Sequence, residues 1–257
     1  MSKAQKIRLL SQIIFTVVFS WAILHFWGRA GAHNLCPFAL FQSPILAIKH
    51  SVPLFFTGGV ILGVVFIVLG AIFPRAFCGW ACPIGFVVRI LGVIGNKLKL
   101  TTKIPVRLND RLAWLAVLVF AYLVLLTAVS GRMFCVGGCP LFWGYSACAV
   151  PIGAMSIAFL AFFLTGSMFI ERFFCRWICP YGAVLGIIGR FSIFAISKRE
   201  TECGACKVCS KCPMGTLPKD TPVVVGPMCI SCLECVDVCP RSRLFMGKRK
   251  SKKEDIK

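Results

Sequence analysis

The sequence predicts an all-α, polytopic membrane protein in which four transmembrane helices, arranged as two hairpin repeats, precede a small cysteine-rich C-terminal module. Hydrophobic residues make up 58% of the 257 residues, whereas about half is usual for a soluble chain. They gather in four long runs, and the polar end of the chain holds half of the 16 cysteines. A short motif with two cysteines follows the second and the fourth run, and this recurrence predicts the repeats.

Each of the four runs is long enough to form a transmembrane helix, which takes about 20 residues to cross a hydrocarbon layer of about 30 Å. The runs are residues 13–27 with their flanks, 52–73, 112–130 and 152–170. The first run, followed by Ala30-Gly31-Ala32, also fits a cleavable secretory signal peptide. We interpret it as a retained helix, and its removal would leave the orientation of the other three unchanged.

The 29 lysines and arginines are distributed unevenly along the chain. The first ten residues hold three, residues 75–111 hold seven, and the chain from Arg172 onward holds sixteen. Basic residues near helix ends stay on the cytoplasmic side, so we expect a multi-pass protein of the inner membrane with both termini and both motifs in the cytoplasm. The net charge of +20 is therefore a topology signal and not a sign of nucleic-acid binding. The basic segment 248–253 either touches anionic membrane lipid or is a solvated tail.

The polar end of the chain carries two cysteine quartets, which predict a cytoplasmic domain of residues 199–257 after a transmembrane domain of residues 1–198. The second quartet has the C-x2-C-x2-C-x3-C-P spacing of bacterial ferredoxins, and the first is one residue short before its last cysteine. In that pattern the fourth cysteine of each quartet binds the other cluster. We therefore expect one [4Fe-4S] cluster on Cys203, Cys206, Cys209 and Cys239, and another on Cys229, Cys232, Cys235 and Cys212.

Zinc and disulfides are the alternatives for these eight cysteines. Zinc also takes four cysteine ligands per site, but the doubled triplets and the Cys-Pro pairs favour the ferredoxin pattern. Disulfides are disfavoured on the cytoplasmic side of a membrane.

The repeated motif reads FCGWACPIG from Phe77 and FCRWICPYG from Phe174. With the two motifs aligned, Gly85 pairs with Gly182, and beyond the motifs Gly92 pairs with Gly189. A thiolate near hydrocarbon is costly unless it is bound to metal or otherwise paired. The prolines after the second cysteines suit the first turn of a helix, whose free N–H groups favour an anionic cluster. Nearby arginines, Arg75, Arg172 and Arg176, would offset further negative charge. We expect a third cluster on Cys78, Cys82, Cys175 and Cys179, with reduced structural thiols as the alternative.

The four remaining cysteines fall in the two connections expected on the outer side of the membrane. These residues are Cys36, Cys135, Cys139 and Cys148. They number enough for a fourth cluster, but an oxidising compartment equally favours disulfides, either Cys135 with Cys139 or Cys36 with Cys148.

These motifs make the chain resemble the ferredoxin-type membrane subunits of the NapH and MauN family, the quinol dehydrogenase component that serves periplasmic nitrate reductase. The resemblance rests on the two C-x3-C-P motifs and on the paired quartets from Cys203 to Cys239. It implies four helices with a cytoplasmic ferredoxin module, oxidation of membrane quinol, and electron delivery to a partner iron-sulfur protein or cytochrome. Membrane domains of nitrous oxide respiration regulators and of copper-oxidase assembly factors share the motif pair, so the motif does not select the pathway. The outer cysteines and the shortened quartet depart from the family pattern.

Haem is not expected as an electron carrier within this chain. All three histidines, His25, His33 and His50, lie in its first fifth, so a pair of bis-histidine haems across the bilayer is not encoded. His33 and His50 would bind a quinone or be interfacial residues.

Glu171, Trp80 and Trp177 are the other candidates near the motifs. Glu171 is the one acidic residue that adjoins both a membrane run and a motif, and it would either accept a proton from quinol or, as we favour, form an ion pair with a neighbouring arginine. Trp80 and Trp177 would pack a cluster or a quinone ring, or serve as interfacial aromatics.

Two functions follow from these features. The first is an iron-sulfur electron-transfer subunit of a complex that exchanges electrons with the quinone pool and with partner redox proteins. The second is an assembly or regulatory membrane protein whose clusters reduce a metal or sense redox state for another metalloenzyme.

Overall fold

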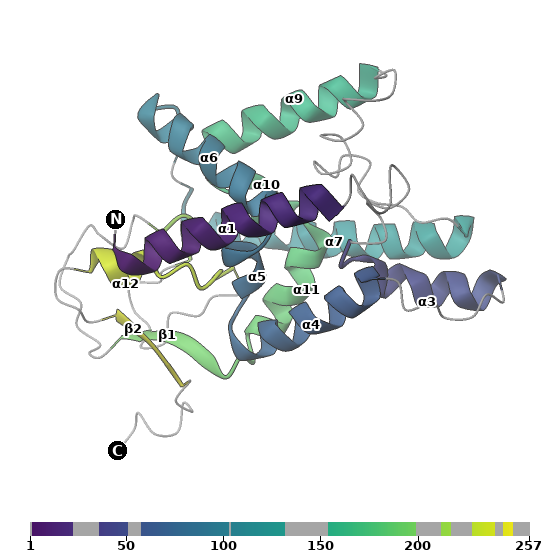
Figure 1. Cartoon of the computed structure of the whole chain (residues 1–257). Coiled ribbons are helices and arrows are strands. Elements are labelled where there is room, and N and C mark those ends of the chain that lie inside the picture. Colours follow the sequence, from purple (N-terminus) through teal and green to yellow (C-terminus); the bar gives the residue numbers. More distant parts are fainter. Residues whose placement is uncertain are drawn as a thin grey trace.

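The computed structural model describes residues 2–22, 36–50, 58–102, 104–131, 154–198, 212–216, 228–239 and 244–248. These residues are mostly helical (Figure 1). The helices are α1 (Lys3–Ala22), α3 (Ala39–His50), α4 (Gly58–Ile72), α5 (Ala76–Trp80), α6 (Pro83–Lys97), α7 (Val106–Ser130), α9 (Ala154–Phe169), α10 (Phe173–Trp177), α11 (Pro180–Gly189) and α12 (Glu234–Val238). The strands are β1 (Phe194–Lys198) and β2 (Leu244–Lys248).

Within these ranges one helix, Arg107–Ser130 in α7, is both long and apolar enough to cross a membrane. Helices α1, α4 and α9 fall on the other three predicted runs, but parts of those runs lie outside the described residues. The four-helix membrane domain therefore stays a prediction. Helix α3 occupies a connection for which the sequence predicted no helix.

The two cysteine motifs adopt the same local structure. In each, a short helix (α5 or α10) follows an arginine in the left-handed region, with φ of 45° at Arg75 and 57° at Arg172. The second cysteine then caps a longer helix (α6 or α11) that begins with a proline. Proline suits this position because its fixed φ is helical and the first turn needs no N–H from it.

The helices that follow the motifs exchange partners. Helix α6 of the first repeat packs on α9 of the second, and α11 of the second packs on α4 of the first and on α7. Figure 1 shows α6 beside α9, and α11 beside α4. Glycines allow these approaches. A Cβ on Gly92 would lie 3.4 Å from Glu171 Cγ, and a Cβ on Gly189 would lie 3.1 Å from Pro74 Cβ. The paired glycines thus meet equivalent positions of the opposite repeat.

Strands β1 and β2 form an antiparallel two-stranded sheet in which Ile196 pairs with Met246. Ile196, Cys229 and Leu244 are buried together. Since β1 precedes the first cysteine quartet and β2 follows the second, the sheet brings together the two ends of the cysteine-rich segment. The predicted boundary at residue 198 falls at the end of β1.

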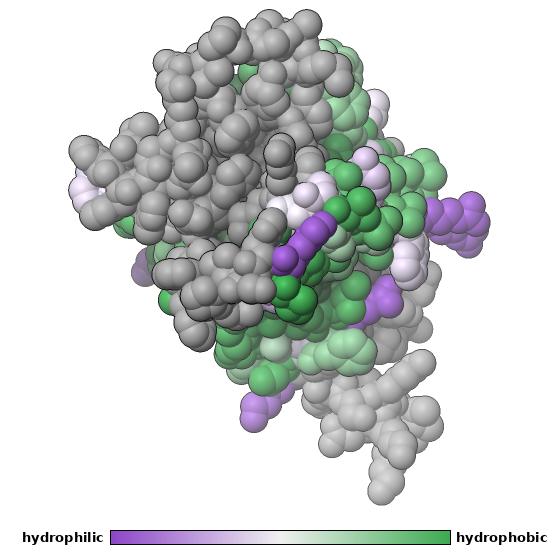
Figure 2. All heavy atoms as spheres, turned by 90° about the vertical axis from the view of Figure 1, so that its right-hand side faces the viewer, coloured by the Kyte–Doolittle hydropathy of each residue, from purple (hydrophilic) through white to green (hydrophobic). Residues whose placement is uncertain are grey.

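The surface is strongly apolar along α7. Trp114, Leu118, Tyr122, Leu125 and Val129 are each at least 63% exposed. They recur at three- or four-residue spacing, so they form a stripe along the helix. In Figure 2, apolar residues likewise cover much of the described surface. Soluble monomers rarely expose an apolar area of this kind, which agrees with the predicted contact with lipid.

Candidate iron-sulfur sites and the contact between them

The structure brings the four cysteines of the two motifs together. Cys78 in α5 and Cys175 in α10 are each 8% exposed, and Cys82 and Cys179 cap α6 and α11. The pKa of the Cys78 thiol is raised to about 11, mainly by burial and less by Cys175, against the lowering effect of Arg75. The pKa values of Cys82 and Cys179 are raised by burial and then by the charges of Cys78 and Cys175. Four thiols, two buried and two half-buried, that repel one another as thiolates are a suitable donor set for a cationic iron centre.

Two buried arginines cross between the repeats at this site. Arg75 Nη1 donates to the carbonyl oxygen of Cys175 at 3.5 Å, and Arg172 Nη1 donates to that of Cys78 at 3.4 Å. Arg75 Nε, Arg172 Nη2 and Arg176 Nε are buried without a hydrogen-bond partner among the described residues. A buried donor left unpaired costs about 1–3 kcal/mol. Three such nitrogens from guanidinium groups beside the cysteines fit a negatively charged group held by thiolates.

The helix starts supply further donors. Gly182 N donates to Cys179 Sγ at 3.3 Å, and a hydrogen bond from the Gly85 backbone lowers the pKa of Cys82 against the larger effect of burial. Space requires glycine at position 85, where a Cβ would lie 2.5 Å from Cys78 O, whereas a Cβ on Gly182 would meet Cys179 Cβ at an ordinary 3.4 Å. Free N–H groups at a helix N-terminus stabilise anions, so both helix starts offset part of the cost of a buried thiolate at the second cysteine.

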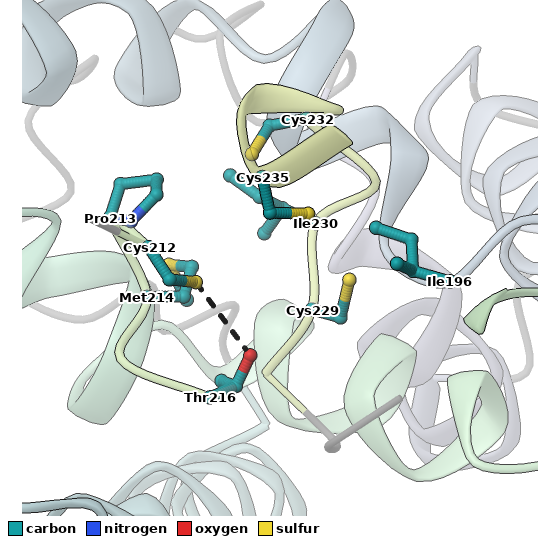
Figure 3. Close-up of a pocket in the computed structure, with 9 residues that line it drawn as sticks. All are labelled: Ile196, Cys212, Pro213, Met214, Thr216, Cys229, Ile230, Cys232 and Cys235. Atoms are coloured by element: carbon teal, nitrogen blue, oxygen red, sulfur yellow. Dashed lines mark hydrogen bonds between the residues drawn. The ribbon is translucent and has the colours of Figure 1, made fainter. Parts of the chain in front are cut away.

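The tail provides a second candidate site. Cys212, Cys229, Cys232 and Cys235 line one pocket together with Ile196, Pro213, Met214, Thr216 and Ile230 (Figure 3). Burial raises the pKa of Cys229 to about 12 and that of Cys232 to about 11. The pocket combines the first three cysteines of the second quartet with the last of the first, which is the exchange that the ferredoxin spacing predicts.

The other predicted ligands are only partly described. Cys239 packs with the β1–β2 sheet, whereas Cys203, Cys206 and Cys209 lie outside the described residues. Among the described residues, no group of three or more histidine, cysteine, aspartate or glutamate side chains converges as a site for a single metal ion.

Of the four cysteines expected on the outer side of the membrane, Cys36 precedes α3. The other three, Cys135, Cys139 and Cys148, lie outside the described residues. Phe38, near Cys36, packs against Phe120 in the middle of α7, and Lys49, at the other end of α3, donates to Ala128 O and Val129 O. Helix α3 therefore runs along the second half of α7, with Cys36 level with the middle of that helix.

None of the three histidine side chains lies within the described part of the structure. His25 and His33 lie outside the described residues, and of His50 only the backbone, at the end of α3, is described.

The pocket in the tail packs directly on the first cysteine motif. One hydrophobic cluster contains Cys78, Ala81, Ile230 and Cys232, together with Met214. Gly79 lies so close to the tail that a Cβ there would be 2.4 Å from Ile230 O. The two candidate sites are therefore in van der Waals contact through their own ligand segments.

Hydrogen bonds join the same two segments. Trp80 Nε1 donates to Ser231 O at 3.0 Å, and Ser231 Oγ donates to Pro74 O at 2.8 Å. The indole of Trp80 thus ties the first motif to the loop between Cys229 and Cys232.

The second motif holds the other part of the tail pocket. Trp177 Nε1 donates to Asn109 Oδ1 at 3.1 Å, Asn109 Nδ2 donates to Met214 O at 2.9 Å, and Arg176 donates to Pro213 O. Each repeat therefore contacts one cysteine segment of the tail. Trp177 is 6% exposed, so it is a buried contact residue and not an interfacial aromatic.

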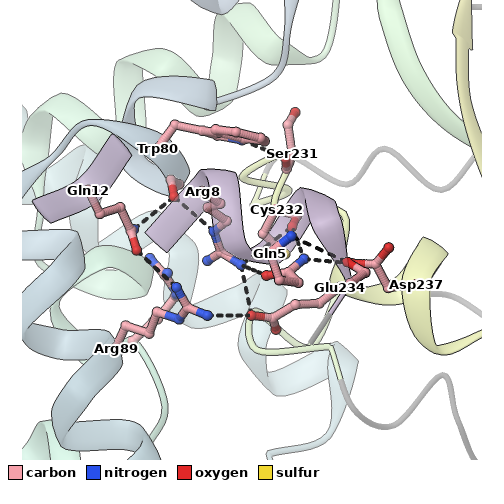
Figure 4. Close-up of polar contacts among 12 residues, drawn as sticks. Gln5, Arg8, Gln12, Trp80, Arg89, Ser231, Cys232, Glu234 and Asp237 are labelled. Carbon is pink, nitrogen blue, oxygen red and sulfur yellow. Dashed lines mark hydrogen bonds and ion pairs between the residues drawn. The ribbon is translucent and has the colours of Figure 1, made fainter. Parts of the chain in front are cut away.

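Helix α1 adds a third set of contacts, which the sequence did not indicate (Figure 4). Gln5 Nε2 donates to Cys232 O at 2.9 Å, and Gln12 Nε2 donates to Gly79 O at 2.8 Å. Arg8 reaches both carbonyls and also pairs with Glu234. These polar residues precede the first predicted membrane run, and nothing in the sequence marks them as buried.

Glu171 differs from expectation. Its Oε1 accepts a hydrogen bond from Asn96 Nδ2, and no ion pair to it is found among the described residues, so the favoured ion-pair interpretation was wrong. Burial raises the pKa of Glu171, against the lowering effects of the Asn96 hydrogen bond and of Arg176.

Comparisons with known proteins give the family. A family profile described as a 4Fe-4S binding domain matches residues 54–101, 112–142 and 152–199, which include both C-x3-C-P motifs. The Methanocaldococcus jannaschii protein MJ0750 is 32% identical over 95% of this chain and 96% of its own length. The putative electron transport protein YccM of Escherichia coli is 26% identical over 93% and 72%. The ferredoxin-type protein NapH of Escherichia coli is 26% identical over 71% and 64%. The chain belongs to the NapH-type ferredoxin family.

In this NapH-type chain, the profile covers the two motif repeats and not the cysteine quartets of the tail. The 4Fe-4S description therefore falls on the sequence around Cys78, Cys82, Cys175 and Cys179, which the structure brings together. No solved structure is significantly similar to this NapH-type chain.

Proposed function

We propose that this chain is a membrane-bound iron-sulfur electron-transfer subunit that passes electrons between the quinone pool and partner redox proteins of a respiratory complex. One observation carries the proposal. The tail pocket of Cys212, Cys229, Cys232 and Cys235 packs on the motif that holds Cys78, within a single hydrophobic cluster. Two sulfur donor sets in direct contact suit electron exchange, because tunnelling rates fall steeply with separation.

The residues fit iron-sulfur clusters at both sites. The motif cysteines would hold one [4Fe-4S] cluster and the tail quartets two, and each cluster when bound accepts and releases single electrons. The chain itself supplies the thiolates, the unpaired nitrogens of Arg75, Arg172 and Arg176, and an apolar lining. That lining excludes water, and burial is one of the properties that set a cluster potential.

The contacts also support an order of sites. The tail pocket adjoins the first motif, whereas Cys239 and Met246 pack against the cluster of Ile196, Cys229 and Leu244 at the sheet. We therefore propose that the site of Cys203, Cys206, Cys209 and Cys239 is the outermost in the cytoplasm. It would exchange electrons with a partner there.

We further propose that the protein is a multi-pass inner-membrane protein with both termini in the cytoplasm. The apolar stripe along α7 and the basic residues after Arg172 support this placement. A fourth cluster on Cys36, Cys135, Cys139 and Cys148 would serve an outer partner, an iron-sulfur protein or a cytochrome, and disulfides remain its alternative.

The test is quinol-dependent reduction. Full-length protein is purified without air, reconstituted in lipid nanodiscs, and mixed with a reduced membrane quinol while cluster absorbance and EPR signals are recorded. We expect the tail clusters to be reduced in the wild type and to be reduced more slowly in Cys78→Ser. If quinol does not reduce the wild-type clusters and quinone does not oxidise the prereduced clusters, the quinone link is contradicted. A metalloenzyme maturation defect in a deletion strain, with no quinol reaction, would favour the assembly function instead.

A further inference from the structure

Arg8 of α1 lies between the two candidate sites. Its side chain is fully buried; Nε donates to Gly79 O at 3.0 Å and Nη1 contacts Cys232 O at 3.4 Å. Nη1 also pairs with Glu234 Oε1 at 2.7 Å (Figure 4). Gly79 lies between the two cysteines of the first motif, and Cys232 is a predicted ligand of the tail cluster.

Among the described residues, Arg8 is the side chain that donates to both of these carbonyls. Gln12 donates to Gly79 O, and Gln5 donates to Cys232 O, but neither reaches the other site. One planar guanidinium with several fixed donors therefore spans the contact. A shorter or more flexible side chain in its place cannot keep both bonds at once.

The charge of Arg8 is placed to act on the tail site. Hydrogen bonds and net charge around a cluster set its reduction potential, and a cation next to a ligand backbone favours the reduced, more negative state. Glu234 offsets part of this charge, and Arg89 stands 3.9 Å from the same carboxylate oxygen. Arg89 is bonded to Gln12 and contacts neither carbonyl in the described structure.

We propose that Arg8 is a positioning residue for electron transfer, holding the tail site against the first motif and raising the reduction potential of the tail cluster. The inference rests on the proposed function, since it assigns a role within that electron path. The bonds of Trp80 and Ser231 would still join the tail to the motif after Arg8 is replaced, so we expect a looser contact between the two sites and not their separation.

The experiment compares full-length, anaerobically purified wild type with Arg8→Gln and Arg8→Lys. Arg89→Gln is the matched control, since it removes a charge from the same group of side chains without touching either carbonyl. Iron and sulfide content is measured first. EPR redox titration then gives the potential of the tail cluster and the spin–spin interaction between the tail and motif clusters, and rapid mixing gives the rate of electron exchange.

We expect Arg8→Gln to keep its iron, to lower the tail potential, to weaken the spin–spin interaction and to slow exchange by about tenfold or more, as outer-shell substitutions at metal sites do. Arg8→Lys should restore the reduction potential of the tail cluster more than the rate of electron exchange. Lysine keeps the positive charge but cannot bond to both carbonyl oxygens. Arg89→Gln should keep the spin–spin interaction of the wild type.

Wild-type potential and spin–spin interaction in Arg8→Gln would overturn the assignment while leaving the proposed function intact. If Arg8→Gln does not accumulate, Arg8→Lys decides: a wild-type rate in it overturns the proposal. A wild type without a motif cluster would be recognised by its iron content, and it would overturn the proposed function and this inference together.

Discussion

Arg75 and Arg172 each hydrogen-bond to the cysteine motif of the opposite repeat. Arg75 donates to Cys175 O and Arg172 to Cys78 O, and both adopt a left-handed backbone conformation just before their own motif. Non-glycine residues rarely adopt positive φ. The two arginines therefore connect the two repeats at the four cysteines. The positive φ of each arginine costs about 1–3 kcal/mol of backbone strain.

Replacing one of these arginines should empty the site at the motifs. We expect Arg172→Gln to lose about four irons per chain, because the amide cannot both bond to Cys78 O and offset thiolate charge. Iron and sulfide analysis measures this loss. Arg190→Gln, which changes an arginine beyond α11, should keep its iron, and full iron in Arg172→Gln would show that the arginine is not needed to hold the cluster.

A methyl group on Gly79 should push the tail away from the first motif. The added Cβ would lie 2.4 Å from a backbone oxygen, Ile230 O, which a rotamer change cannot relieve. Overpacking of this kind costs about 1–3 kcal/mol, so Gly79→Ala should lower the thermal unfolding temperature and increase proteolysis of the tail. Gly92→Ala is the control, since its Cβ would meet Glu171 Cγ at an ordinary 3.4 Å; equal proteolysis of the two variants would contradict the observed contact.

The exchange of the fourth cysteines can be tested in the tail. Cys212 lines the same pocket as Cys229, so Cys212→Ser and Cys229→Ser should alter the same EPR signal. Cys239→Ser should alter a different one. If Cys239→Ser and Cys229→Ser changed one signal and Cys212→Ser another, each quartet would bind its own cluster.

Several features of this arrangement could be predicted from the sequence because they depend on local spacing. The quartet spacing places Cys212 with Cys229, and the offset between the repeats pairs Gly92 with Gly189 before any contact is known. These patterns recur along the chain, and short-range geometry is enough to interpret them.

The remaining features depend on contacts between distant segments, which no spacing reports. Arg8 and Asn109 lie just before the first and third predicted membrane runs, yet both bond to backbone carbonyls of the tail. Helix α3, with Pro44 inside it, packs on α4 and α7. The sequence predicted only a connection between two membrane runs in this segment. The sequence predicted an ion pair between Glu171 and an arginine because arginines are its neighbours in sequence. In the structure, Asn96 of α6 donates a hydrogen bond to Glu171 instead.

Glu171 should make stability depend on pH. Burial raises its pKa in the folded protein above the usual value of about 4.3. A carboxyl with a raised pKa favours the fold while it is protonated, and this contribution is lost as the pH rises from the unfolded value through the folded one. The unfolding free energy of the wild type should therefore fall relative to Glu171→Gln across that window.

Urea titration in detergent at several pH values measures this difference. Asn96→Ala removes a hydrogen bond that lowers the pKa of Glu171, so it should move the window to higher pH. A wild type and a Glu171→Gln variant with parallel pH profiles would contradict the buried carboxyl.

We expect iron-sulfur centres to occupy both the tail and the motifs and to lie next to each other. Iron and acid-labile sulfide per chain, counted in air-protected wild type and in the Cys78→Ser, Cys175→Ser double variant, test it most directly. We expect at least about twelve irons in the wild type, with matching sulfide, and a loss of about four in the variant. Equal iron content in the two proteins would show that the motifs bind no cluster. A wild type without sulfide would show that the protein binds no iron-sulfur cluster at all.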